Sequence, residues 1–269
     1  MSIETHQEKN PHSEGQILPV LIDADIISYQ VGFSKEVTDA ATALSRTRDV
    51  VDYIKHNAQQ EDFGQFHFYL TGKGNFRNDY AVTAQYKANR SGRDKPEFLE
   101  LIRGYLRMEY DAIVTEGREC DDAIATHAAS LDYNCIAASI DKDFLQIPCW
   151  HFNFRRGEWY KPTEWEGLQF FYSQILTGDA VDNIIGLKGI GPKKAEKALK
   201  ECTTVEELYK VCVDMYAQQA FKDCDGKLGF SSVEDLMLHN SELVKGRVLE
   251  NGRLLWLQRY EGQIWESPA

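Results

Sequence analysis

The chain has 269 residues, of which 43% are hydrophobic and 12% aromatic, so we expect a folded globular protein and not a disordered one. Its formal net charge of −12 argues against a surface that is basic throughout, and no apolar run approaches the ~20 residues that cross a membrane. The six cysteines form no CxxC pair, which argues against a structural zinc site and favours reduced, packed thiols.

The N-terminal residues 1–17 are polar and lack the apolar segment of a signal peptide, so we expect a flexible leader on a cytoplasmic protein. Short apolar runs then predict buried strands, and helical patterns lie between them. The strand runs are 18–23, 66–72, 111–117 and 135–143, and the helical patterns are 96–110 and 121–131. This alternation predicts an α/β fold with a mostly parallel central sheet over residues 18–162.

The chain changes character near residue 163. A hairpin-like segment at 150–162, turning near Gly157, ends the α/β part. Three Ser or Thr residues, each with Glu three positions later, then form capping boxes that predict helix starts. They are Thr163, Thr203 and Ser231, and the first two precede helical patterns at 165–177 and 205–221. Residues 163–269 are therefore expected to form a helical subdomain.

Carboxylates stand where the predicted strands end and again near the start of the helical part. Because the carboxyl ends of parallel strands meet at one edge of a sheet, we expect these acids to lie together. One such aspartate is usually a turn or capping residue, but nine converging carboxylates repel one another unless hard divalent cations neutralise them. Two Mg²⁺ or Mn²⁺ ions are therefore the expected cofactors. The nine residues are Asp23, Asp25, Glu119, Asp121, Asp122, Asp141, Asp143, Asp179 and Asp182.

Two basic segments interrupt the acidic chain. Residues 73–107 carry eight Lys and Arg against four Asp and Glu, and residues 188–200 carry five Lys against one Glu, so each has a local charge of +4. In 186-GLKGIGPKKA-195 the glycines let a phosphate approach the backbone, and the helix opened by Pro192 presents free N–H groups to it. This segment predicts sequence-independent binding of a DNA backbone, with an ordinary helix–turn–helix corner as the alternative.

Five motifs, in this order along the chain, resemble those of the 5′→3′ exonuclease and flap endonuclease family, particularly its stand-alone phage enzymes. They are the strand ending at Asp23, 86-YKANR-90, 119-ECDDAIA-125, 139-SIDKDF-144 and 178-GDAVDNIIGLKGIGPKKA-195. The resemblance runs from about residue 20 to residue 200. It implies a PIN-like, or resolvase-like, nuclease core, with a helix–three-turn–helix DNA clasp at about 175–200.

The resemblance also implies a role for each matching residue. One metal ion would be surrounded by Asp23, Glu119, Asp121 and Asp122, and the other by Asp141, Asp143, Asp179 and Asp182. Lys87 and Arg90 would stabilise charge on the scissile phosphate, with Asp23, Asp121 and Asp141 as the catalytic carboxylates. Tyr86 would stack on a terminal base, with a core tyrosine as the alternative. The residues expected to contact DNA are Tyr86, Arg93, Gly186, Lys188, Gly189, Ile190, Gly191, Lys193 and Lys194, with a K⁺ ion on the carbonyls of 186–191.

Two features depart from the family's pattern. The family's second strand ends in an aspartate ligand, whereas this chain has Thr71 and Gly72 there. We hypothesise that Asp25 compensates, and the alternative is that Asp25 only caps the next helix. The arch region, at about 86–95, is also short, with about five residues (91–95) outside the expected helix. We therefore expect a preference for duplex 5′ ends over long flaps.

The sequence thus predicts a divalent-metal-dependent 5′→3′ exonuclease that acts on 5′ ends or junctions of double-stranded DNA and leaves 5′-phosphates by two-metal hydrolysis. RNA/DNA hybrids and 5′ flaps are further expected substrates, and a monomer is favoured, in the host cytoplasm if the protein is a phage enzyme. Three alternatives stay open. They are a DNA-binding protein with weakened catalysis, a nuclease that cuts RNA, and a haloacid dehalogenase-type phosphatase built on Asp23, Asp25, Thr71 and Asp179.

Overall fold

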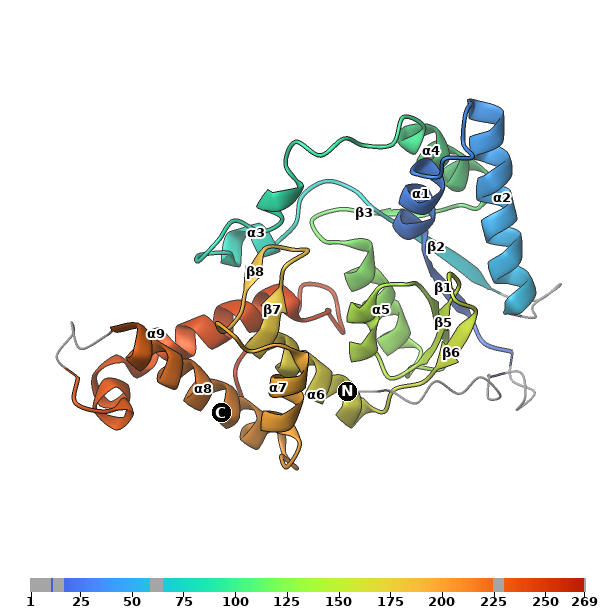
Figure 1. Ribbon diagram of the computed structural model, residues 1–269. Helices are drawn as coiled ribbons and strands as arrows, with labels where there is room; N and C mark the ends of the chain where they lie inside the picture. The colour runs from blue at the N-terminus through green and yellow to red at the C-terminus, as the bar shows by residue number, and fades with distance from the viewer. Residues whose placement is uncertain (1–10, 12–16, 59–64, 225–229, 269) are drawn as a thin grey trace.

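The computed structural model describes residues 11, 17–58, 65–224 and 230–268, so the expected leader lies almost wholly outside the described residues. A six-stranded sheet with the order β3-β2-β1-β4-β5-β6 forms the centre of the α/β part (Figure 1). Its strands are β1 (Val20–Asp23), β2 (Phe66–Thr71), β3 (Ile113–Thr115), β4 (Ile136–Ala138), β5 (Trp150–Asn153) and β6 (Glu158–Tyr160). Every pairing is parallel except that of β5 with β6. The expected α/β fold and the hairpin at 150–162 are confirmed.

The sheet is buried on both faces, which explains the continuous apolar runs in its strands. In β1, Val20 and Ile22 belong to the core on one face of the sheet, while Leu21 belongs to the core on the other. Helices α1 (Ala24–Gly32), α2 (Ala40–Asn57) and α4 (Leu99–Glu109) cover the first face, and α5 (Cys120–Ser130) covers the second (Figure 1). The parallel order leaves the carboxyl ends of β1, β2, β3 and β4 at one edge.

Helix α4 begins at Leu99, three residues after the expected start at Pro96. Pro96 is buried against Gly32, where an added Cβ would lie 2.5 Å from the Cβ of Pro96. The amide of Leu99 donates to the carbonyl of Pro96 at 3.1 Å, so residues 96–98 form a turn that leads into the helix. The proline thus fixes the approach to α4, and the helix itself starts one turn later.

Helices α6 (Glu164–Thr177), α7 (Pro192–Leu199), α8 (Val205–Cys224) and α9 (Val233–Leu255) form a second, helical core (Figure 1). The capping box of Thr163 with Glu166 is confirmed at the start of α6. The other two boxes lie one residue later than expected. Thr204 accepts from the amide of Glu207 at 3.2 Å, and Ser232 accepts from the amide of Asp235 at 3.2 Å.

The sequence allows both registers, because each box contains two hydroxyl residues followed by two acids. The second register adds bonds from the first hydroxyl residue of each pair. Thr203 donates to Glu207 from its amide at 2.7 Å and its hydroxyl at 3.1 Å, and Ser231 donates to Asp235 at 2.9 and 3.1 Å in the same way. These extra donors explain the shift.

The chain returns from the helical part to the α/β part after α9. Gln146 donates to the carbonyl of Leu255 at 2.8 Å, and Leu257 is buried in the same core as α5. The two parts are therefore joined by buried contacts as well as by the chain at 162–163, and the predicted domain boundary stays a prediction. Within the described residues, no helix is both long and apolar enough to cross a membrane.

Candidate active site

A cleft of about 390 Å³ opens at the carboxyl ends of β1 and β4. The hairpin of β7 (Gly178–Asp179) and β8 (Ile184–Ile185) brings the last two acids to it from the helical part. Eight of the nine expected carboxylates line this cleft together with Lys87 and Arg90: Asp23, Asp25, Glu119, Asp121, Asp141, Asp143, Asp179 and Asp182. Segments that are far apart in the sequence therefore meet at one edge of the sheet, as the strand ends predicted.

Helix capping holds several of these carboxylates in place. Asp23 ends β1 and caps α1, accepting from the amide of Ile26 at 3.1 Å and from the hydroxyl of Ser139 at 3.0 Å. Asp141 caps the 3₁₀ turn η3 (Lys142–Gln146) and accepts from the amide of Asp143 at 2.9 Å. The same residues thus end a strand, start a helical turn and point a carboxylate at the cleft.

Asp122 lies outside the cleft, which corrects its expected place among the metal ligands. Its carboxylate is fully buried and forms a two-pronged ion pair with Arg77, at 2.5 and 3.0 Å, and it also accepts from the amide of Gln258 at 3.2 Å. Successive residues on an α-helix point about 100° apart, and in the first turn of α5 this difference separates Asp121 from Asp122. Asp121 faces the cleft, and Asp122 anchors the helix to Arg77.

Tyr86 is a core residue, and its expected stacking on a base is corrected. Its ring is 6% exposed and packs with the helical core. Its hydroxyl contacts Glu119 Oε2 at 2.8 Å and Asp182 Oδ2 at 2.9 Å. Burial, followed by the charge of Glu119, raises the pKa of Tyr86 well above its usual value, so the phenol stays protonated and donates to the acids. Tyr86 therefore joins α5 to the β7–β8 hairpin beneath the cleft.

Basic side chains lie within ion-pair distance of six of the nine acids. These pairs are Arg77 with Asp122, Lys87 with Glu119, Arg90 with Asp182, Arg103 with Asp25, and Lys142 with both Asp179 at 2.7 Å and Asp143 at 4.0 Å. Among the residues that the structure describes, no three Asp, Glu, His or Cys side chains are arranged to hold a metal ion as they stand. Eight of the nine expected ligands thus share one cleft, while more than half of the nine already have a cationic partner.

The pKa values divide the cleft into two kinds of acid. Burial and the neighbouring Asp25 raise the pKa of Asp23 to about 7, and burial and Asp141 raise that of Asp143 to about 7. Burial also opposes ionisation of Asp179, but the hydrogen bond from Lys142 lowers its pKa below the usual value. Acids that no cation contacts closely are therefore held partly protonated by burial and by one another. An oxygen-rich cluster in this state fits a hard divalent cation, which would offset both effects.

Lys87 is held at the cleft by its backbone as well as by its charge. Its φ of 54° lies in the left-handed region, at the start of the 3₁₀ turn η2 (Ala88–Arg90), and such a conformation costs a non-glycine residue about 1–2 kcal/mol. The amide of Lys87 donates to the carbonyl of Asp182 at 2.9 Å, and its ammonium lies 3.5 Å from the Asp182 carboxylate. This strained turn fixes both Lys87 and Arg90 against the β7–β8 hairpin.

The end of β2 leaves no room for the family's aspartate at position 72. A Cβ added to Gly72 would lie 2.3 Å from the carbonyl oxygen of Thr115 and 2.7 Å from Glu116 Oε1. Thr71 lines the cleft instead. Asp25 accepts from the amide of Thr71 at 2.9 Å and pairs with Arg103. Since the cap of α1 is Asp23, the alternative that Asp25 caps this helix is wrong, and its compensating role stays a prediction.

The glycine–lysine segment 186–191 leads into α7, which begins at Pro192 with Gly191 as its cap. Gly189 has a φ of +73°, so a glycine is needed at this turn. Lys188, Lys193 and Lys194 are exposed beside it, as is Arg93 on the other basic segment. The ammonium of Lys194 donates to the carbonyl of Gly189 at 2.8 Å, one of the carbonyls expected to hold K⁺.

Two residues of this segment also serve packing, and their expected DNA contacts stay a prediction. A Cβ added to Gly186 would lie 2.1 Å from the carbonyl carbon of Thr177, and Ile190 is half-buried against the helical core. The β7–β8 hairpin also separates α6 from the turn, so the two helices are not directly joined. The exposed part of the segment is therefore Lys188, Gly189, Gly191 and the start of α7.

Sequence reasoning missed three basic partners of the acids and one thiol. Arg77 and Arg103 stood in the basic segment 73–107, which showed the charge but not the burial of Arg77. Lys142 lies between the two aspartates of 139-SIDKDF-144, and this position could have indicated that it pairs with acids of the cleft. The thiol of Cys120 is buried 3.6 Å from Asp23 Oδ1, and burial raises its pKa. Its neighbours Glu119 and Asp121 gave the only sequence clue.

A mostly parallel six-stranded sheet, with a carboxylate cleft at its carboxyl edge and a helical part that carries a basic turn, defines the class of PIN-like 5′-nuclease folds. Over 88% of this chain the fold matches that of T5 5′-exonuclease, solved with bound zinc ions, with a TM-score of 0.61 and 16% identity, covering 89% of that chain. The T5 flap endonuclease in a complex with DNA and metal ions matches over 87% of this chain and 88% of its own, with a TM-score of 0.55 and 17% identity.

Sequence relatives point to the same family. Flap endonuclease Xni of Shewanella frigidimarina is 36% identical over 121 residues, which are 40% of this chain and 48% of the relative. DNA polymerase I of Rhizobium leguminosarum is 35% identical over 153 residues, 49% of this chain and 14% of the polymerase. The chain thus spans about half of that flap endonuclease and a small part of the polymerase, and no family model matches it. The resemblance to 5′→3′ exonucleases and flap endonucleases is confirmed.

Proposed function

We propose that this chain is a divalent-metal-dependent 5′→3′ exonuclease that acts on 5′ ends of duplex DNA. The observation that carries the proposal is the convergence of eight carboxylates on one cleft whose rim holds Lys87 and Arg90. The relatives named as flap endonucleases and the shared fold of T5 5′-exonuclease support it. We further propose that the enzyme acts in the cytoplasm. Its secondary substrates would be 5′ flaps and RNA/DNA hybrids.

The cleft offers two groups of oxygen ligands for Mg²⁺ or Mn²⁺. Asp23, Glu119 and Asp121 would hold one ion, and Asp141, Asp143, Asp179 and Asp182 the other. When bound, two such ions supply an activated water and neutralise charge on the leaving oxygen of a phosphodiester. Lys87 and Arg90 bind Glu119 and Asp182 in this structure. A scissile phosphate would give both side chains a second anionic partner and so be positioned against the acids.

The exposed turn at Lys188 and Gly189 and the first turn of α7 would bind the duplex backbone. Lys188, Lys193 and Lys194 supply positive charge there, and the N-terminus of α7 supplies free N–H groups. A K⁺ ion on this turn would have to replace the ammonium of Lys194 at the carbonyl of Gly189. Recognition of phosphates without base contacts agrees with a nuclease that degrades any sequence.

A structure-specific DNA-binding protein with weakened catalysis is the second candidate. It is favoured by the cationic partners of six acids and by Gly72, where no carboxylate fits. The phosphatase alternative is disfavoured, because both oxygens of Asp25 are engaged, one by Arg103 and one by the amide of Thr71. With both oxygens held, this carboxyl group is not free to turn toward a leaving group.

The test is the degradation of a 5′-labelled duplex and a 5′-flap substrate with Mg²⁺, Mn²⁺ or EDTA. We expect metal-dependent release from the duplex 5′ end and loss of at least ~10²-fold in rate in Asp141→Asn. Asp214→Asn, an exposed aspartate on α8, is the matched control and should behave like the wild type. Tight duplex binding without cleavage under either metal would favour the binding protein, and turnover of simple phosphomonoesters would favour the phosphatase.

A further inference from the structure

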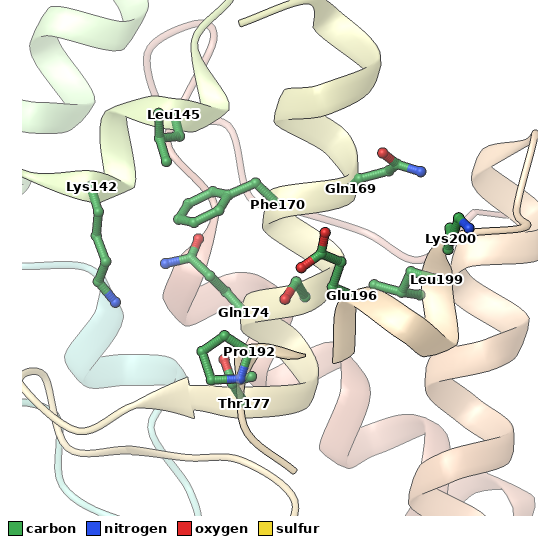
Figure 2. A pocket seen from close by; sticks show the side chains of 11 residues that line it. Lys142, Leu145, Gln169, Phe170, Gln174, Thr177, Pro192, Glu196, Leu199 and Lys200 are labelled. Carbon is green, nitrogen blue, oxygen red and sulfur yellow. The ribbon is translucent and has the colours of Figure 1, made fainter. Parts of the chain in front are cut away.

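A second cavity lies behind the acidic cleft, between η3, α6 and α7 (Figure 2). Its volume is about 290 Å³, near the lower end of the range for small-molecule sites. Figure 2 shows the ring of Phe170 in the middle of the cavity wall, with Leu145 on one side and Gln174 on the other. Leu199 and the exposed Lys142 also line it, as does Ser173 on α6. The cavity thus combines an aromatic and aliphatic wall with polar groups, two lysines (Lys142 and Lys200) and one acid (Glu196).

Lys142 and Gln174 connect this cavity to the acids of the cleft. The ammonium of Lys142 lies 2.7 Å from Asp179 Oδ2 and 4.0 Å from Asp143 Oδ1, and Lys142 lines both hollows. Gln174 donates to Asp143 Oδ1 at 2.6 Å from the cavity side. An anionic ligand in the cavity would therefore have its charge next to the cation that faces Asp179 and Asp143.

We propose that this cavity binds a 5′-nucleoside monophosphate, with the base on Phe170 and Leu145 and the phosphate at Lys142. A planar aromatic base fits a wall of aromatic and aliphatic side chains, and base–aromatic stacking contributes about 1–3 kcal/mol. A phosphate at Lys142 gains a charge-assisted hydrogen bond. The choice of a nucleotide among aromatic anions rests on the proposed function, since an exonuclease that leaves 5′-phosphates releases this compound beside the cavity.

Two ligands have this chemistry and could occupy the cavity. The first source is the free mononucleotide, and the second is the 5′-terminal nucleotide of a bound strand. In either case the phosphate would compete with Asp179 and Asp143 for Lys142. Occupation of the cavity would then change the charge balance of the cleft, so a free mononucleotide is expected to inhibit the nuclease more strongly than a nucleoside does.

Thymidine 5′-monophosphate is titrated into the full chain without divalent metal by isothermal titration calorimetry, and thymidine and inorganic phosphate are titrated separately. We expect the nucleotide to bind at least about tenfold more tightly than either part. Three substitutions at Ser173 form a matched series. Ser173→Phe fills the cavity and Ser173→Asp repels the phosphate, and both should weaken nucleotide binding about tenfold or more, whereas Ser173→Ala should leave it unchanged. Ser173→Asp keeps the test decisive if Ser173→Phe does not fold.

The second arm compares cleavage of duplexes with a 5′-phosphate and a 5′-hydroxyl by the wild type and Ser173→Asp. If the wild type binds the free nucleotide and Ser173→Asp does not, the first source is supported. If neither protein binds the free nucleotide but Ser173→Asp loses a preference for the 5′-phosphate that the wild type shows, the second source is supported. If the nucleotide binds no better than thymidine and the variants alter neither arm, the proposal is overturned. Because the calorimetric arm needs no cleavage, nucleotide binding by a chain that does not cut DNA would contradict the proposed function and leave the cavity assignment standing.

Discussion

The hydroxyl of Tyr86 illustrates how one donor organises the cleft. It lies between Glu119 and Asp182, two acids from different parts of the chain. It has a single hydrogen to donate, and Lys87 supplies further donors to the same two carboxylates. The three side chains Tyr86, Glu119 and Asp182 therefore act as one unit. Removal of the Tyr86 hydroxyl should lower the stability of the fold and also change the position of the two carboxylates.

We expect Tyr86→Phe to keep the ring packing and to lower the free energy of unfolding by about 1–3 kcal/mol, because a buried acceptor loses its donor. Urea denaturation measures the change, with Tyr29→Phe as a control, since Tyr29 is 40% exposed on α1. Unchanged stability in Tyr86→Phe, with weaker binding of DNA ends in Tyr86→Leu, would restore the stacking role that the structure argues against.

His151 makes the stability of the protein depend on pH. It is 1% exposed, and its Nε2–H donates to the carbonyl of Ile147 at 2.7 Å, while Nδ1 has no partner among the described residues. Burial lowers the pKa of His151 to about 4, against the opposing effect of the bond to Ile147. A lowered histidine pKa stabilises the fold above the unfolded value of 6.5, and this contribution is lost as the pH falls toward 4.

Between pH 7.5 and pH 5, we expect this group to remove about 2 kcal/mol from the free energy of unfolding. His151→Phe keeps the stacked contact with Tyr160, whose ring centroid is 4.8 Å away, and should remove this part of the pH dependence. Guanidinium denaturation at the two pH values gives the change in the free energy of unfolding for each protein. The contribution of the carboxylates is the same in both proteins and therefore cancels in the difference. An equal loss in wild type and variant would mean that His151 does not titrate in this range.

At the scale of elements, the end of β2 decides whether the missing aspartate can be restored. Thr71 faces the cleft and accepts from the amide of Cys120 at 3.0 Å, a bond that an aspartate could keep. Gly72 faces Thr115, the last residue of β3, and Glu116, which follows β3. Side chains at successive positions of extended chain point to opposite sides, so position 71, the last of β2, can supply a carboxylate to the cleft and position 72 cannot.

We expect Thr71→Asp to strengthen Mn²⁺ binding on the order of tenfold, because it adds a ligand charge, and Thr71→Asn, its uncharged match, to leave binding unchanged. Gly72→Asp should instead lower the free energy of unfolding by about 1–3 kcal/mol or more through overpacking, and Gly72→Ala should already show most of this loss. Calorimetry with Mn²⁺ and thermal unfolding provide the two measurements. A stable Gly72→Asp protein with tighter metal binding would show that the end of β2 can rearrange.

At the scale of the whole molecule, charge is separated by location. The chain carries a net charge of −12, yet Lys188, Lys193 and Lys194 are exposed together at the turn before α7 and at its start. Eight of the 42 acids are gathered in the cleft, where metal ions would neutralise them. The proposed DNA contact is thus local and basic, while the remaining surface repels DNA.

We expect duplex binding to weaken steeply with salt and Lys193→Gln/Lys194→Gln to reduce the slope of log K against log[salt] by about 1–2, since each phosphate contact releases about one counterion. Fluorescence anisotropy between 50 and 200 mM salt measures the slope, in EDTA so that no cleavage occurs. Lys210→Gln, an exposed lysine on α8, is the control. A slope that is the same in all three proteins would mean that the turn does not contact the backbone.

The sequence by itself determined the strands in chain order, the edge at which the acids gather, and the glycine turn before α7, but the predicted helical patterns did not include α1 and α2. These features follow from local rules: apolar runs form buried strands, parallel strands end at one edge, and a left-handed turn needs a residue such as Gly189. Local rules also left two capping boxes ambiguous by one residue, because each had two hydroxyls and two acids in a row.

Only the tertiary structure decided which acids face the cleft and which basic side chains they meet. Asp122 turns to Arg77, Tyr86 is buried under Glu119 and Asp182, and Lys142 pairs with Asp179 across a gap of 37 residues in the sequence. Such pairs depend on the direction in which each side chain leaves its element and on the packing of α/β and helical parts. Neither is recorded in residue types or spacing, because a carboxylate at a strand end can bind a metal, a cap or a buried arginine equally well until its neighbours in space are known.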